Sequence, residues 1–125
     1  MFENADLIHS YTRAQALADG VLVDVSTVAR EAGIRYPVAL TRAAWGRCVR
    51  VPPGVACPAS SGRLWDVLWL LALSLRRASG ALVRVAVHVR NSNREGTPPL
   101  VRLKALYGPG DDGEPVLTVM LPDED

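Results

Sequence analysis

The sequence has few of the residues on which metalloproteins and disulfide-rich proteins depend. Among 125 residues there are 2 cysteines, 2 histidines and 1 phenylalanine, and aromatic residues make up 6% of the chain. Cys48 and Cys57 are too few for a disulfide scaffold, and no metal-ligand spacing accompanies them. We therefore expect reduced thiols, no bound metal and no cofactor.

Known catalytic motifs are also missing. The sequence has no Gly-x-Ser-x-Gly, no phosphate-binding loop and no His-Glu-x-x-His. A triad using His9 or His88 would need distant residues without support from any motif. Burial of Cys48 as a small apolar side chain is favoured over a role as a catalytic thiol. We predict no catalytic residues and a protein that is not an enzyme.

The chain has neither an excess of one charge nor an apolar segment long enough for a membrane span. Its net charge is +1 at pH 7, so no overall field attracts it to nucleic acid or membranes. The apolar stretch at residues 64–75 is shorter than the about 20 residues that a span needs. The first residues, MFENADLIHS, lack the basic and apolar regions of a signal peptide. These features predict a cytoplasmic protein without membrane contact.

The most prominent feature that the sequence does have is one strongly apolar helix. Residues 62–80 read GRLWDVLWLLALSLRRASG, with apolar positions around most of the helix circumference. Such a helix must be covered on more than one side, which predicts a central core helix. Trp65 and Trp69 are expected to pack in the core rather than form a ligand box. Ser60 or Ser61 is the expected N-cap.

The residues before this helix predict short alternating elements. Thr12-Arg13-Ala14-Gln15 matches a capping box, and Thr41 precedes another helical segment. The expected elements are a helix at 13–19, a strand at 21–25, a helix capped by Ser26 or Thr27 and ending at 32, an extended segment at 34–40 and a helix at 42–49.

The residues after it predict three strands. Apolar and polar side chains alternate at 82–90, 101–107 and 116–121. Consecutive strands with short connections form an antiparallel meander. We therefore predict an α+β fold in a single domain over residues 1–125. In this fold the central helix packs on the three-stranded C-terminal meander, and short N-terminal strands and helices complete the domain.

The outer face of the predicted meander is the candidate binding site. Its five members are basic or titratable: Arg84, His88, Arg90, Arg102 and Lys104. Like charges on neighbouring strands destabilise a sheet, so their retention indicates an anionic partner. The simpler alternative is a solvated face balanced by Asp111, Asp112 and Glu114. Single-stranded nucleic acid is less favoured, because the one nearby aromatic residue, Tyr107, is expected to face inward.

The acidic segment GPGDDGEP at residues 108–115 has two readings. Its carboxylates resemble cation ligands, but the other ligands of a calcium loop are missing. Glycine, aspartate and proline are the residues that favour tight turns. We predict a turn and no metal site.

Several stretches together carry a resemblance to a known family. They are ENADLIHSYTRAQALADGVLVDVS, AREAGIRYPVALT, GRLWDVLWLL and GPGDDGEPVLTVMLPDED, and the resemblance extends over almost the whole chain. The sequence resembles a family of small proteins of unknown function that are spread through bacterial genomes, plasmids, integrative elements and phages. The resemblance implies an accessory role, such as inhibition of a host defence system by an anti-restriction or anti-CRISPR protein. It implies no catalytic residues.

The main hypothesis is a small non-enzymatic protein that binds a protein partner through the basic strand face. Two alternatives stay open. One is a small enzyme with a cleft between the N-terminal arm and the sheet, lined by His9, Asp24 or His88. The other is a homo-oligomeric protein, such as a homodimer formed through surplus apolar helix surface.

Overall fold

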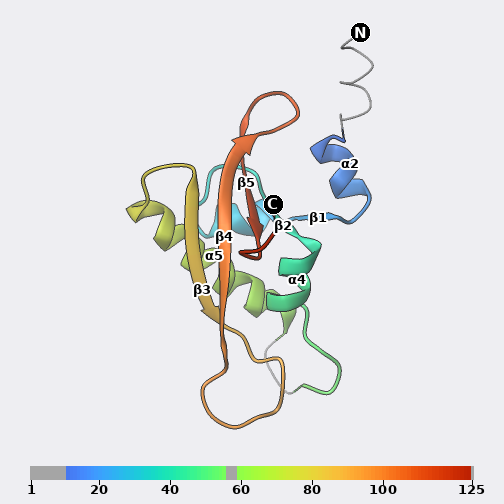
Figure 1. Ribbon diagram of the computed structural model, residues 1–125, viewed down its shortest axis with the longest axis vertical. Coiled ribbons are helices and arrows are strands. Elements are labelled where there is room, and N and C mark those ends of the chain that lie inside the picture. Colours follow the sequence, from blue (N-terminus) through green and yellow to red (C-terminus); the bar gives the residue numbers. More distant parts are fainter. Residues whose placement is uncertain (1–10, 56–58, 125) are drawn as a thin grey trace.

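The computed structural model describes residues 11–55 and 59–124 and has an α+β fold, as expected (Figure 1). Its elements are, in order, α2 (Arg13–Ala18), β1 (Leu22–Asp24), α3 (Ser26–Glu31), β2 (Val38–Thr41), α4 (Arg42–Cys48), α5 (Ser60–Arg77), β3 (Leu82–His88), β4 (Leu100–Pro109) and β5 (Pro115–Met120).

All five strands form one mixed sheet, in the order β1-β2-β5-β4-β3. The strands β3, β4 and β5 pair antiparallel, β1 pairs antiparallel with β2, and β2 runs parallel to β5. The prediction of a three-stranded meander was therefore incomplete. The sheet extends beyond β5, because β2 pairs with β5 at positions such as Val38 and Leu117. Parallel pairing joins segments that lie far apart in the sequence, and alternation along each strand cannot reveal it.

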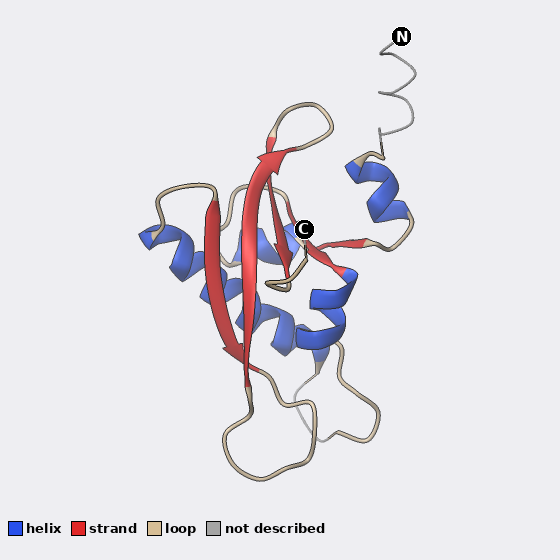
Figure 2. Cartoon of the chain, in the orientation of Figure 1, coloured by secondary structure: helices blue, strands red, loops and turns tan. Residues whose placement is uncertain are grey.

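The hydrophobic core lies between the sheet and a layer of helices. In the view of Figure 2, α5 crosses behind the strands. Leu64, Leu68 and Leu71 of α5 are buried against valines and leucines from the inner face of the sheet. The helices α3 and α4 also contact α5 and β2, so their buried faces belong to the same core.

The central helix differs from the prediction at its N-terminus and on one side. Ser60 is its first residue, and the N-cap is Ala59, which makes no side-chain capping bond. Trp65 and Trp69 are 37% and 45% exposed, so the prediction that they pack in the core was wrong. The core covers one stripe of α5, and these indoles lie one turn apart beside that stripe.

The caps of the short helices could be predicted in part. The capping box of Thr12 and Gln15 at α2 is confirmed, and Thr41 accepts a hydrogen bond from the Ala44 N–H of α4. Ser26 does not cap α3, because it is already its first residue. Its hydroxyl donates to the Asp24 carboxylate at 2.6 Å and accepts from the Val38 N–H at 3.0 Å.

The acidic loop between β4 and β5 holds α2 in place. The Asp111 carboxylate accepts from the backbone N–H groups of Arg13 and Ala14, at 2.7 and 3.0 Å. The half-buried Arg13 side chain donates to Thr118 and to the Leu117 carbonyl, and burial lowers the pKa of its guanidinium. Among the described residues, no group of three or more His, Cys, Asp or Glu side chains could hold a metal ion.

Candidate functional site

Three basic side chains of the predicted site share the outer face of β3 and β4. Arg84 lies directly opposite Lys104, and Arg102 lies opposite Ala86. Arg84 and Arg102 are exposed, and Lys104 is half-buried. Together with Pro122 they line a shallow groove of about 250 Å³. The structure thus brings Arg84, Arg102 and Lys104 together as one cluster, which we call the basic face.

Within the described part of the chain, the basic face is not neutralised by hydrogen-bonded or ion-paired acidic side chains. The acidic residues considered as partners have other roles. Asp111 binds the N-terminus of α2, and a Glu114 oxygen accepts from the Asp112 N–H at 3.0 Å. The positive charges therefore face solvent at this surface.

His88 and Arg90 were expected in the same cluster, but the loop after β3 engages both. His88 Nδ1 lies 2.8 Å from the Pro98 carbonyl oxygen. Arg90 donates to the carbonyl oxygens of Arg94 and Gly96. Arg90 also lies beyond the end of β3 at His88. These two side chains hold the loop of residues 91–99, and the basic face is smaller than the alternation pattern predicted.

Apolar side chains flank the basic face at both ends. Leu82 at the start of β3 is 41% exposed, and Leu100 at the start of β4 is 46% exposed. Leu82 lies opposite Leu106, and Leu100 lies opposite His88, so both leucines share the outer face. Val116 and Met120 have outer-face positions in β5 but are buried. The open part of this face is thus confined to β3 and β4.

Strand β3 is also an edge of the sheet. The Tyr107 N–H donates to the Ala81 carbonyl, and the Val89 N–H donates to the Pro99 carbonyl. In an antiparallel pair, alternate residues of a strand direct both backbone groups toward the partner strand. The odd-numbered residues of β3 therefore bond to β4, and Arg84 and Ala86 direct their N–H and C=O groups to the open edge.

The exposed tryptophan pair is a surface that the sequence reading assigned to the core. The rings of Trp65 and Trp69 stack with centroids 5.9 Å apart and planes inclined by 24°. Helical spacing could have indicated their exposure. The buried stripe runs through positions 64, 67, 68 and 71, and residues at positions 65 and 69 lie to one side of it. The helix therefore presents a flat aromatic surface on the side away from the basic face.

The residues proposed for a catalytic cleft are not assembled in the described part of the structure. Asp24 is on β1 and His88 is on β3, at opposite edges of the sheet, and His9 lies outside the described residues. Cys48 is buried, and burial raises the pKa of its thiol to about 11. The thiol is therefore neutral at physiological pH, whereas a nucleophilic cysteine reacts as the thiolate. Cys57 lies outside the described residues.

Comparison with known proteins shows which family the chain belongs to. No described helix is long and apolar enough to cross a membrane. Neither a curated protein nor a solved structure is detectably similar to the chain. The model of the Family of unknown function (DUF6573) matches residues 1–125, and the chain belongs to this family.

Proposed function

We propose that this is a non-enzymatic binding protein that docks an acidic segment of a protein partner on the basic face. The observation that carries the proposal is the cross-strand pair of Arg84 and Lys104, with Arg102 one pair further along. Like charges directly opposite each other destabilise a strand pair. Acidic side chains of a partner would replace this repulsion with attraction, so binding would recover a cost that the free protein carries.

The composition of the surrounding surface favours a protein partner over nucleic acid. Leu82 and Leu100 give the basic face an apolar rim, and protein interfaces combine arginine with apolar side chains. Proteins that bind single-stranded nucleic acid stack bases on aromatic rings between their basic groups. The outer-face positions of β3 and β4 carry no phenylalanine, tyrosine or tryptophan. The ring of Tyr107 packs against the core on the other face.

The open edge of β3 supports a specific mode of docking. An extended segment of a partner can add to a sheet edge through backbone hydrogen bonds, while neighbouring side chains select the sequence. Arg84 and Ala86 have backbone groups that point to this edge, and the Arg84 side chain projects onto the basic face. A partner strand with acidic residues at alternate positions would satisfy both features. The family resemblance leads us to propose that such docking inhibits or assists a host protein.

The test is capture of partner proteins from a bacterial lysate by three immobilised proteins. The wild type is compared with an Arg84→Glu/Arg102→Glu variant and with an Arg50→Glu/Arg94→Glu variant. The control pair makes the same charge change at exposed arginines outside the basic face. We expect the control to retain the partner and the Arg84→Glu/Arg102→Glu variant to lose it. The melting temperature of that variant should be no lower than that of the wild type, because Arg84→Glu places opposite charges across the strands at Lys104. Equal capture by all three proteins would contradict the proposal.

Salt dependence tests the electrostatic part of the same proposal. Charges on an exposed face are screened over about 10 Å at 0.1 M salt and over about 3 Å at 1 M. Binding of the purified partner to wild-type protein should therefore weaken as salt is raised. The Arg50→Glu/Arg94→Glu variant should show the same dependence. Affinity that does not change with salt would show that the basic face does not drive binding.

Self-association is a second candidate, and the exposed tryptophan pair favours it. Tryptophan is enriched among the residues that dominate interfaces. Trp65 and Trp69 stack on the surface of α5 instead of packing in the core. A homodimer through α5 would appear as twice the monomer mass in light scattering, and Trp65→Ala/Trp69→Ala would reduce it to the monomer. A monomeric wild type at high protein concentration would exclude this candidate.

A further inference from the structure

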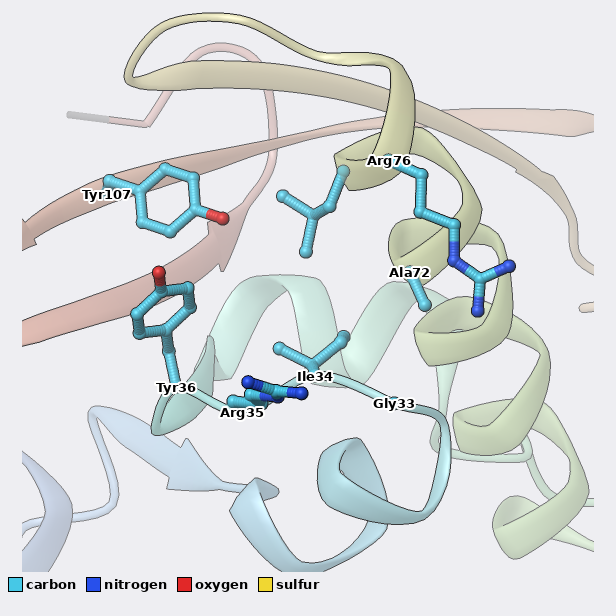
Figure 3. A pocket seen from close by; sticks show the side chains of 8 residues that line it. Gly33, Ile34, Arg35, Tyr36, Ala72, Arg76 and Tyr107 are labelled. Carbon is cyan, nitrogen blue, oxygen red and sulfur yellow. The ribbon is translucent and has the colours of Figure 1, made fainter.

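A cavity of about 270 Å³ lies on the helix side of the sheet, on the opposite face from the basic face. It is formed by the segment between α3 and β2, by the last turns of α5 and by β4. Figure 3 shows Tyr36 and Tyr107 on one side of this space, Ile34 and Arg35 below it and Ala72 and Arg76 on the other side. Segments far apart in the sequence thus contribute to one concave site.

Two tyrosines form an aromatic wall. The rings of Tyr36 and Tyr107 meet edge to face, with centroids 5.4 Å apart and an angle of 89° between their planes. In Figure 3 the Tyr107 hydroxyl points into the space in front of α5. Burial raises the pKa of this phenol, and the neighbouring Tyr36 adds to the shift. Within the described residues neither hydroxyl bonds to another protein group, and both stay accessible to solvent or a ligand, since Tyr36 is 41% exposed and Tyr107 is half-buried.

The charged residues at the cavity are both arginines. Arg35 and Arg76 line it, and no acidic side chain does. An Arg76 guanidinium nitrogen would lie 4.0 Å from a Cβ atom at Gly33, so Arg76 reaches back over the segment between α3 and β2. Ile34, Ala72 and Leu75 supply an apolar surface between the arginines and the tyrosines. Guanidinium groups bind carboxylates and phosphates, and phenol hydroxyls donate to the same anions.

We propose that this cavity binds a small aromatic or apolar group that carries a carboxylate or a phosphate. The apolar body would pack on Ile34, Ala72 and Leu75 against the aromatic wall. The anionic group would accept hydrogen bonds from an arginine at the rim, Arg35 or Arg76, and the Tyr107 hydroxyl would lie beside the apolar body on the opposite side. The volume lies just below the about 300 Å³ at which most ligand pockets begin, which suits a single ring with one anionic substituent. The ligand can be a free small molecule or the C-terminal residue of a peptide.

The test is a titration of the wild-type protein followed by two-dimensional NMR of its backbone amides. The probes are benzoate, phenyl phosphate and benzyl alcohol, which share a ring and differ in charge. We expect saturable shifts at Gly33, Tyr36, Ala72 and Tyr107, with at least one anion binding about tenfold more tightly than benzyl alcohol, as one charged hydrogen bond supplies. Equal binding of all three probes would overturn the anion site. So would the absence of saturable shifts with both anions.

Peptides identify the source of the anionic group. Acetyl-Gly-Phe with a free carboxylate is compared with the same peptide ending in an amide. Tighter binding of the free carboxylate than of benzoate would assign the site to a peptide terminus. Weaker binding would assign it to a free small molecule. Either result requires the amide peptide to bind more weakly than the free carboxylate, and equal binding of the two peptides would overturn the anion site.

Variants separate this site from the basic face and from general destabilisation. Arg35→Gln/Arg76→Gln should weaken binding of the anionic probe by about tenfold or more, and Tyr107→Phe, which keeps the ring in place, should have a smaller effect. Arg77→Gln is the matched control, because Arg77 is in the same turn of α5 but does not line the cavity. Arg84→Glu/Arg102→Glu should leave probe binding intact. Loss of binding in either of these last two variants would overturn the assignment.

Discussion

Arg84 and Lys104 face each other directly across β3 and β4, on the solvent-exposed side of the sheet. Both carry a positive charge, and Arg102 lies on the adjacent pair of the same face. A folded domain has little free energy to spare, so we expect a repulsive pair of this kind to lower the stability of the free protein measurably. A substitution that removes this repulsion should therefore raise the stability of the free protein and weaken its binding to the partner.

Lys104→Glu should make the free protein more stable and abolish partner capture. The substitution places opposite charges across the strands, which is worth about 0.2–1 kcal/mol in the free energy of unfolding. Urea denaturation measures the stability, and capture from lysate measures binding. Lys104→Gln, which only removes the charge, should have a smaller effect on both. A more stable variant that still captures the partner would show that the basic face is an ordinary solvated surface.

Arg63→Met should destabilise the fold although it replaces a charged side chain by an apolar one. Arg63 is buried and donates to the Arg50 carbonyl at 3.1 Å and to the Asn91 Oδ1 at 2.7 Å. A hydrogen bond from a charged donor contributes about 1.5–3 kcal/mol to stability, and the variant loses both bonds. We expect a loss of about 2 kcal/mol or more in the free energy of unfolding, measured in urea. A change below about 0.5 kcal/mol, typical of surface positions, would contradict this role.

Asp111→Ala should loosen α2 without unfolding the sheet. The Asp111 carboxylate accepts from the backbone N–H groups of Arg13 and Ala14, so it acts as a cap from a distant loop. Loss of a cap costs about 1 kcal/mol. Hydrogen exchange should become faster at the amides of α2 and stay unchanged in β4. Asp112→Ala is the control, and an equal effect in that variant would show that only the charge of the loop matters.

The buried Cys48 makes stability fall at high pH. The pKa of its thiol rises from 9.0 to about 11 on burial, so the folded protein keeps a proton that the unfolded chain releases between these values. The contribution of the neutral thiol is complete below pH 9.0 and is lost as the pH rises through about 11. Cys48→Ala should weaken this dependence, measured by urea denaturation between pH 8 and pH 11. An identical dependence in the variant would assign the effect to other groups.

Thiol labelling checks the same burial independently. In a Cys57→Ser background, Cys48 should react with a thiol reagent at pH 8 only as fast as the protein unfolds. Rapid labelling of the native protein would show that Cys48 is accessible.

Much of the fold follows from local signals in the sequence. The capping residues Thr12 and Thr41 start helices because their side chains satisfy free N–H groups nearby in the chain. Alternation in β3 and β4 places Arg84, Arg102 and Lys104 on one face because strand side chains have a period of two. Such signals depend only on neighbouring residues.

The remaining features depend on contacts between distant residues. The parallel pairing of β2 with β5 leaves no local trace in the sequence. The exposure of Trp65 and Trp69 depends on which sides of α5 the other elements cover, and composition alone cannot reveal that. The side chains of His88 and Arg90 are not part of the basic face, because they form hydrogen bonds with the loop carbonyl oxygens of Pro98 and Gly96. Backbone acceptors of this kind are independent of residue type.

The most direct test of the proposed function is photo-crosslinking from the basic face. Leu82→p-benzoylphenylalanine places the photoreactive group on the exposed outer face at β3, and Trp69→p-benzoylphenylalanine places it on the exposed side of α5. Both proteins are irradiated with the captured partner. The proposed function predicts a crosslinked complex from position 82 and none from position 69. A crosslink from position 69 alone would show that the partner binds the helix side and would contradict docking on the basic face.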